Sequence, residues 1–185
     1  MFELNHNSIN AIKKGDRKVI LDLYRYTFQV LMGNAVRYSN DQEKQMEIVN
    51  NAFMKIVANI DQFQLGTAYF SWAKQIVKRE IIDDFRKNKR YKELFSYDDD
   101  YKNDSLVSEP EIDTTFQAEE LQQLLDHLPP ATKLVFNLYA IDGYSSKEIM
   151  EELQISYETV KWHIKEARKR LKNVLSIHQT QEMKS

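Results

Sequence analysis

The sequence predicts an all-helical protein made of two small domains joined by an acidic flexible linker. Two observations predict helices: the 185 residues include only four Gly and three Pro, and apolar residues recur at intervals of three and four along most of the chain. A third observation divides the chain, because residues 96–115 have neither a helical nor a strand period. We therefore expect a first domain at 5–92, a linker at 93–115, a second domain at 116–177 and a tail at 178–185.

Four helices are expected in the first domain. Ile9 and Ile12 lie on a short helix that ends at Gly15, and a long helix follows over residues 19–35. The third helix has the clearest amphipathic period, formed by Ile48, Val49, Ala52, Phe53, Ile56, Val57 and Ile60. Residues 70–90 predict a fourth helix, with an apolar stripe formed by Ala73, Val77, Ile81 and Phe85. Four such helices can close one core.

The second domain is expected to begin with two helices separated by a proline pair. The first covers residues 116–128 and stops before Pro129, because the residue before a proline disfavours helical geometry. Pro130 can occupy the first turn of the next helix, which runs to Ile141. Gly143 then ends that helix.

Residues 143–171 are the most informative stretch and read GYSSKEIMEELQISYETVKWHIKEARKRL. Ser145 and Glu148 form an S-x-x-E capping box, in which each side chain bonds the other residue's backbone amide. Residues 154–156 form a break, and Ser156 is the expected N-cap of the following helix. Two short helices at a sharp turn indicate a helix-turn-helix at about residues 145–165.

The second helix of this motif is predicted to contact DNA. Val160, Ile164, Ala167 and Leu171 form a narrow apolar stripe that faces inward. The residues expected outside this stripe or along its flank are Thr159, Lys161, Trp162, His163, Lys165, Glu166, Arg168, Lys169 and Arg170. A helix fits the major groove, where polar and aromatic groups read bases and basic groups hold phosphates. The alternative is a solvated basic helix whose Trp162 is covered by a neighbour.

Charge is strongly segregated along the chain, although the formal net charge is only −2. Residues 74–92 hold eight Lys or Arg against three acids, and residues 159–172 hold six against one. Between them, residues 93–126 carry eleven Asp or Glu and a single base, Lys102. Two basic surfaces joined by an acidic segment indicate two contacts with nucleic acid.

The basic fourth helix interleaves its charges with aromatic residues, among them Tyr69, Phe70 and Trp72. Aromatic rings can stack on unpaired bases while Lys and Arg follow the backbone, a contact worth about 1–3 kcal/mol per base. In the alternative interpretation, the aromatic residues belong to the core and the RKNKR segment is a solvated helix end that complements the dipole.

Four stretches in register make the chain resemble an extracytoplasmic-function sigma factor of the sigma-70 family, particularly its Bacteroidetes-like branch. Opening helices of that family resemble IKKGDRKVILDLYRYTF, and its polymerase-clamp helix resembles EIVNNAFMKIVANIDQF. Its promoter-melting helix resembles YFSWAKQIVKREIIDDFRKNKR. The family's second domain resembles LPPATKLVFNLYAIDGYSSKEIMEELQISYETVKWHIKEARKRL.

The resemblance implies a division of roles. The first domain would bind core RNA polymerase and capture and melt the minus-ten element, and the second would read the minus-thirty-five element. Polymerase contacts would come from Glu47, Asn50, Asn51 and Met54. Minus-ten contacts would come from Gln64, Thr67, Tyr69, Trp72, Lys78, Arg79, Arg86, Lys87 and Arg90. Ser156 would join the minus-thirty-five contacts named above. The resemblance also implies an anti-sigma partner and a cytoplasmic location.

Several residues depart from the family pattern. Lys44, Gln45, Met46 and Glu47 stand where an acidic cluster is common. Asn51 replaces a frequent acid, and Arg79 replaces a frequent Asn. Gln154 fills a turn position where Gly is usual, and Trp162 and Glu166 stand where small and basic residues are frequent. We therefore expect an unusual promoter sequence.

No cofactor, metal site or catalytic activity is expected. The chain has no Cys and its four His are scattered, so the usual metal-ligand spacings are missing. No stretch is apolar enough for a membrane span, and no signal peptide begins the sequence.

One rival class is a conventional helix-turn-helix regulator that binds duplex DNA as a dimer. The other is a hydrolase using Asp83 and Asp84 or Asp98 to Asp100, which lack a positioned partner.

Overall fold

The structure is a computed structural model that describes residues 2–87 and 118–182, with side chains placed in 2–87 and 122–175. Every element within the described residues is helical, which confirms the predicted all-helical class. The chain divides into two compact units at the boundary between Asp84 and Phe85. The predicted linker at 93–115 lies outside the described residues, so we describe each unit by itself.

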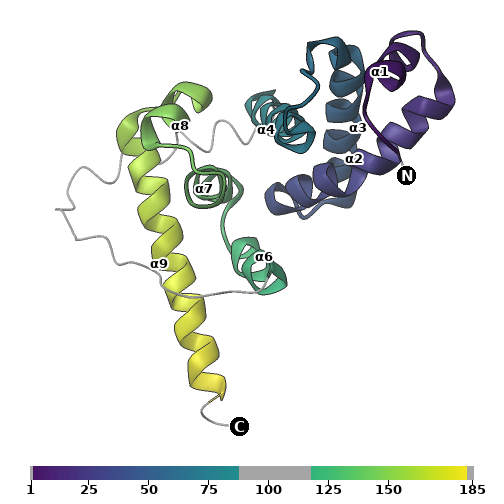
Figure 1. Cartoon of the computed structure of the whole chain (residues 1–185). Helices are drawn as coiled ribbons and strands as arrows, with labels where there is room; N and C mark the ends of the chain where they lie inside the picture. Colours follow the sequence, from purple (N-terminus) through teal and green to yellow (C-terminus); the bar gives the residue numbers. More distant parts are fainter. Residues whose placement is uncertain (1, 88–117, 183–185) are drawn as a thin grey trace. The chain divides into compact units, whose positions relative to one another are not determined.

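The first unit contains four α-helices (Figure 1): α1 (His6–Lys13), α2 (Arg17–Tyr38), α3 (Gln42–Ala58) and α4 (Tyr69–Lys87), of which the last three residues lie past the boundary. Asn5, Asp16 and Asp41 cap the first three helices, because each side chain accepts hydrogen bonds from backbone amides of the first turn. Gly15 joins α1 to α2 with a φ of +79°, a left-handed conformation that favours glycine. The predicted helix ending at Gly15 is confirmed.

The core of the first unit is the stripe that the sequence predicts. Ile48, Val49, Ala52, Phe53 and Ile56 of α3 are all buried. Ile60 is also buried, but it belongs to a separate 3-10 turn (Ile60–Gln62) and not to α3 as predicted. A buried apolar residue can therefore continue the spacing of a helix after that helix has ended.

The second unit contains α6 (Ala118–Asp126), α7 (Pro130–Phe136), α8 (Ser146–Leu153) and α9 (Tyr157–Glu182), with a π turn (Asn137–Ile141) after α7. Pro130 occupies the first turn of α7 as predicted. The helical segment reaches Ile141, but its last turn is widened, since the Asp142 amide donates to the Asn137 carbonyl at 2.9 Å.

α9 is held to α6 and α7 by one apolar cluster. Its buried members are Leu124, Leu125, Leu128, Phe136, Ala167 and Leu171, and Ile141, Val174 and Leu175 pack against them. Because the cluster takes residues from both ends of the unit's sequence, it fixes α9 as a long scaffold. The helix-turn-helix formed by α8 and α9 is built on that scaffold.

Candidate nucleic-acid interface

The entry into α8 is a complete capping box. The Ser145 amide donates to Glu148 Oε2 at 2.8 Å, and the Glu148 amide donates to Ser145 Oγ at 3.2 Å. The hydrogen bond from the Ser145 amide, followed by the Ser145 side chain, lowers the pKa of the Glu148 carboxyl, because a donor favours the charged form. The predicted start of the helix-turn-helix is therefore confirmed.

The turn between α8 and α9 depends on a left-handed residue. Gln154 has a φ of 53° and a ψ of 43°, and is the only non-glycine with positive φ among the described residues. Ile155 is buried beside it, and Ser156 Oγ accepts from the Thr159 amide at 3.0 Å. Ser156 thus caps α9 as predicted, and its hydroxyl oxygen is used in this capping hydrogen bond.

The inner face of α9 is wider than the sequence analysis expected. Val160, Ile164, Ala167 and Leu171 are buried as predicted, but Thr159 and His163 are buried too, with His163 fully inaccessible. His163 Nδ1 lies 3.0 Å from Thr132 Oγ1 of α7. The expectation that Thr159 and His163 face outward was wrong. Both lie on the flank of the stripe at about 60–100° from its centre, and α7 packs against α9.

His163 also cannot supply positive charge to DNA at neutral pH. Burial lowers the pKa of its imidazole to about 4, because the charged form is poorly solvated there. The ring of Trp162 contacts the His163 ring edge-on, with centroids 4.8 Å apart, and Trp162 itself remains half-exposed. The Trp162 ring therefore packs against the buried His163 ring and is still partly accessible to solvent.

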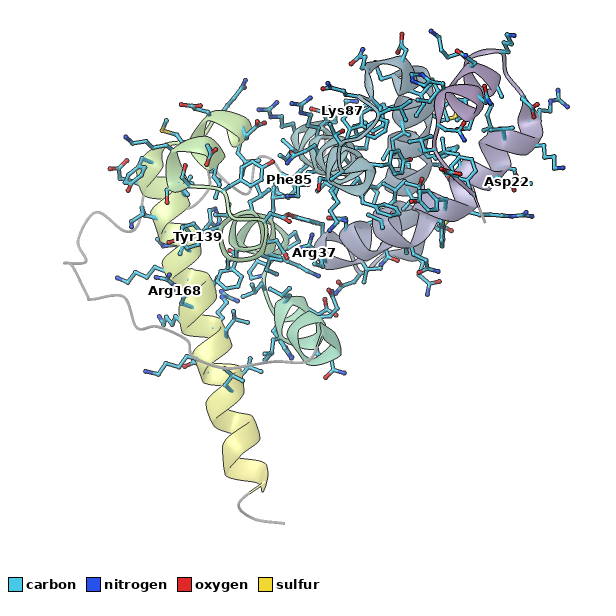
Figure 2. All side chains as sticks on the ribbon, viewed as in Figure 1. Asp22, Arg37, Phe85, Lys87, Tyr139 and Arg168 are labelled. Atoms are coloured by element: carbon cyan, nitrogen blue, oxygen red, sulfur yellow. The ribbon has the colours of Figure 1, made fainter. Side chains whose placement is uncertain are left out.

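The outer face of α9 keeps the basic character predicted for it. Lys161, Lys165 and Lys169 are exposed. The two arginines on its edges have intramolecular partners: Arg168 lies over the ring of Tyr139 at 5.8 Å (Figure 2), and Arg170 Nε donates to Glu166 Oε1 at 2.6 Å. The Tyr139 contact was not predicted, because no local sequence pattern connects residues of two different helices.

In the first unit, a short turn leads into α4. Gln64 and Thr67 are exposed, and Thr67 Oγ1 donates to the Gln64 carbonyl at 2.7 Å. Gly66 has a φ of +89°, which lets the backbone reverse within this turn. Gln64 and Thr67 are therefore accessible, as a minus-ten contact requires.

Tyr69, which the resemblance gives as a minus-ten contact, lies in the core of the first unit. Only 7% of Tyr69 is exposed, and its hydroxyl lies 2.7 Å from Thr27 Oγ1 of α2. Burial raises the pKa of the Tyr69 phenol to about 12. The ring also packs among Phe63, Phe70 and Trp72, so Tyr69 serves the core at the start of α4.

The aromatic residues around Tyr69 remain partly accessible. Trp72 is half-buried with its ring 5.5 Å from that of Phe63, and Phe70 is half-buried with its ring 4.9 Å from that of Tyr26. Tyr26 of α2 is 37% exposed and was not predicted as a site residue. Its position outside the apolar stripe of α2 was the one signal that could have identified it.

The basic residues of α4 differ in accessibility. Arg79 and Lys87 are exposed and Arg86 is half-buried, whereas Lys78 is only 8% exposed. Lys78, which the resemblance gives as a minus-ten contact, lies one helical turn before the buried Ile82, and most of its side chain is covered. Arg90 lies outside the described residues.

The residues predicted to contact polymerase lie on the exposed face of α3. Glu47, Asn50, Asn51 and Met54 are all exposed, and Met54 reaches 65%. Asn50 Oδ1 accepts a long hydrogen bond of 3.4 Å from the Tyr24 hydroxyl. An exposed methionine flanked by amides and a carboxylate is a surface suited to a protein partner.

Other kinds of site find no support in the described part of the chain. No group of three or more His, Asp or Glu among those residues could hold a metal ion. None of the described helices is long and apolar enough to cross a membrane.

The arrangement defines a helical nucleic-acid-binding protein of two units, one carrying a basic and aromatic helix and the other a helix-turn-helix. Residues 23–91 match the family model for sigma-70 region 2, and residues 118–171 match that for sigma-70 region 4. The chain belongs to the sigma-70 family and is an extracytoplasmic-function sigma factor, which directs promoter-specific initiation by RNA polymerase. It is not itself an enzyme.

Individual relatives are distant but match over most of their length. The sigma factor EcfG of Rhodopseudomonas palustris is 26% identical over 143 residues, covering 77% of this chain and 77% of EcfG. The sigma factor SigW of Bacillus subtilis is 26% identical over 183 residues, covering 90% of this chain and 94% of SigW. Among solved structures, the sigma factor RpoE in complex with the anti-sigma factor NepR from Bartonella quintana is 22% identical, with a TM-score of 0.48 over 84% of this chain and 98% of that one.

Proposed function

We propose that the two units divide promoter recognition between them, with the outward face of α3 bound to core RNA polymerase. The unit that contains α4 captures the non-template strand of the minus-ten element. The unit that contains α9 reads the minus-thirty-five duplex. The observation that carries this proposal is the agreement between each matched sigma region and the basic, accessible helix face found within it.

In the second unit, base reading falls to Trp162 and Glu166. Both are partly accessible on the outer face of α9, and a carboxylate can accept from the cytosine amino group while an aromatic ring can contact a thymine methyl. Lys161, Lys165 and Lys169 contact phosphates around them. Arg168 and Arg170 reach the backbone from the positions set by Tyr139 and Glu166. Ser156 caps the start of α9, and Thr159 and His163 are buried on its inner face.

In the first unit, the exposed turn at Gln64 and Thr67 and the half-exposed Trp72 surround the captured base. Arg79, Arg86, Lys87 and Arg90 follow the strand's phosphates. Unpairing a base costs a few kcal/mol, and stacking of a captured base on an aromatic ring offsets part of that cost. Polymerase supplies the remainder, since an isolated domain of this size has few strand contacts.

The domain limits that we propose are 5–92, 93–115, 116–177 and 178–185, with the helix-turn-helix at about 145–165. We also propose membership of the Bacteroidetes-like branch, on the four stretches quoted above, and a cytoplasmic location, because core polymerase acts there. The family resemblance implies an anti-sigma factor as the partner that holds this chain inactive. The solved sigma factor RpoE is in complex with the anti-sigma factor NepR, and CnrH is in complex with the cytosolic domain of CnrY.

The test is reconstitution with core polymerase followed by mapping of transcription starts on genomic DNA. The expected result is initiation at sites that share a minus-ten and a minus-thirty-five element. Binding to duplex DNA as a dimer, without initiation in the presence of core polymerase, would instead support the conventional regulator.

A further inference from the structure

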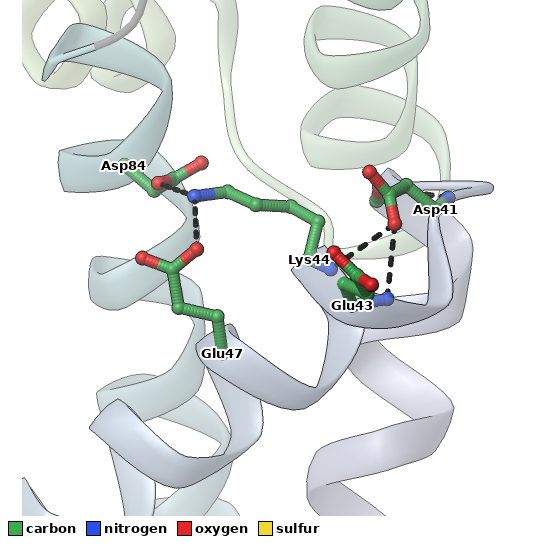
Figure 3. Close-up of polar contacts among 6 residues, drawn as sticks. Asp41, Glu43, Lys44, Glu47 and Asp84 are labelled. Atoms are coloured by element: carbon green, nitrogen blue, oxygen red, sulfur yellow. Dashed lines mark hydrogen bonds and ion pairs between the residues drawn. The ribbon is translucent and has the colours of Figure 1, made fainter.

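Lys44 connects α3 to α4 through an ion pair that the sequence analysis did not predict. Its Nζ pairs with Asp84 Oδ1 of α4 and with Glu47 Oε2 at 2.8 Å (Figure 3). The Lys44 side chain is only 19% exposed, close to the 20% of Asp84. Lys44 therefore reaches across from the first turn of α3 to the last turns of α4.

A lysine is an unfavourable choice for the first turn of a helix. The helix dipole places partial positive charge there, which favours anions and disfavours cations. Asp41 and Glu43 satisfy this preference, and Asp41 Oδ1 accepts from the Glu43 and Lys44 amides at 2.9 and 3.3 Å. Within α3, Lys44 has one acidic partner, Glu47, three residues further along the helix. Asp84 is the partner that connects Lys44 to the other helix.

The pair is electrostatically robust at neutral pH. Burial by itself would lower the pKa of the Lys44 ammonium, but the hydrogen bonds to Asp84 and Glu47 outweigh it, so the pKa is raised above 10.5. Lys44 accordingly stays charged at neutral pH.

A second lysine of α3 makes a similar connection near the other end of that helix. Lys55 Nζ lies 2.5 Å from Glu80 Oε2 and 3.4 Å from Asp83 Oδ2. The acids of α4 therefore face α3. At about 100° of rotation per residue, Arg79 and Arg86 lie about 140° and about 160° away from Asp84 around α4. An attachment at Asp84 consequently fixes where the arginines point.

Glu47 distinguishes the Lys44 connection from the Lys55 connection. It is one of the proposed polymerase contacts and is 56% exposed, yet it shares Lys44 with Asp84. A cationic group of the polymerase that pairs with Glu47 would take Glu47 away from Lys44. Lys44 would then pair with Asp84 alone, which tightens the attachment of α4.

We propose that Lys44 is a positioning residue that couples polymerase docking on α3 to the orientation of the DNA-facing side of α4. The proposal rests on the proposed function of those two helices. It also explains why this chain departs from the common acid at position 44, since Asp84 carries the matching opposite charge.

The test compares Lys44→Met and Asp84→Asn with wild type in the reconstituted holoenzyme. Polymerase affinity and promoter opening are measured separately, by anisotropy and by a fluorescent base analogue in the minus-ten element. Removal of a partly exposed ion pair usually changes an equilibrium constant by a few-fold at most. We expect opening to fall by about threefold in either variant, with polymerase affinity within twofold of wild type. The double variant with both substitutions should show no lower promoter opening than either single variant.

Two controls separate positioning from general damage. Lys18→Met removes an exposed lysine from the first turn of α2 and should leave opening unchanged. The charge reversal of Lys44→Asp with Asp84→Lys should restore opening to within twofold of wild type. Opening by Lys44→Met at the wild-type level, or effects of the two single variants that multiply, would overturn the proposal. A wild-type holoenzyme that opens no promoter would instead refute the function on which it rests.

Discussion

Glu166 and Arg170 form a close ion pair one turn apart on α9, with Arg170 Nε donating to Glu166 Oε1 at 2.6 Å. The pair lies on the edge of the face that we assign to the minus-thirty-five element. Glu166 is 20% exposed and Arg170 45%, so the carboxylate is held in place while the guanidinium remains reachable. In the proposed function the two side chains act together, Glu166 on bases and Arg170 on the DNA backbone.

Replacing Glu166 by Ala is expected to change both specificity and affinity. Without the carboxylate, preference at one base pair should relax by about 1–3 kcal/mol. Arg170, released from its partner, should at the same time strengthen binding to unrelated sequences. Selection from a randomised minus-thirty-five library by the holoenzyme measures both effects. Unchanged preference at every position would remove Glu166 from base reading.

Replacing Lys169 by Ala should weaken promoter binding without changing its sequence preference. Lys169 is exposed on the outer face of α9, where it is placed to contact a phosphate. Loss of one phosphate contact lowers the slope of log affinity against log salt by about 1. Titration of the holoenzyme at several salt concentrations gives that slope. Lys13→Ala, which removes an exposed lysine from α1, should leave it unchanged.

Tyr69→Phe tests the structural role of Tyr69. The Thr27 hydroxyl donates to the Leu23 carbonyl at 2.8 Å, so it accepts from the Tyr69 hydroxyl at 2.7 Å. The variant should lower the free energy of unfolding by about 1 kcal/mol through loss of this buried hydrogen bond. Urea unfolding measures the change. Minus-ten preference should stay as in wild type, and its loss without a change in stability would return Tyr69 to the DNA-binding set.

The sequence predicts helix positions well because capping and spacing act locally. Ser145 with Glu148, and Gly15 at the end of α1, each specify a boundary within a few residues of chain, and the structure contains both. The apolar stripe of α9 was likewise correct. What the spacing could not give is the width of a buried face, which depends on the neighbouring helix.

His163 and Lys44 illustrate that limit. His163 lies at the edge of a stripe, and it contacts Thr132 of α7, which lies 31 residues earlier in the sequence. Lys44 departs from the family pattern, and only its pairing with Asp84 of α4 gives the departure a reason. Contacts between helices distant in sequence leave no periodic signal in a single chain, so the candidate site was predicted less well than the fold.

Gln154→Gly should stabilise the second unit. Gln154 has a φ of 53°, where a side chain costs about 1 kcal/mol relative to glycine, partly offset by the greater freedom of glycine in the unfolded chain. A net gain of up to about 0.5 kcal/mol is expected in the free energy of unfolding, measured by denaturant titration. Gln154→Ala keeps the strain and should give no such gain, which makes it the matched control.

His163 should make the stability of the second unit depend on pH. The folded pKa of about 4 lies below the ordinary 6.5, so between these values the unfolded chain binds more protons. Stability from the neutral, buried ring is therefore fully present above about pH 6.5 and is lost as pH falls towards 4, by an amount on the order of 3 kcal/mol. Denaturant unfolding at several pH values measures the loss. His163→Gln cannot titrate and should have a flatter dependence over this range, because the proton uptake that drives the loss is gone; an equal slope in both proteins would show that another group is responsible.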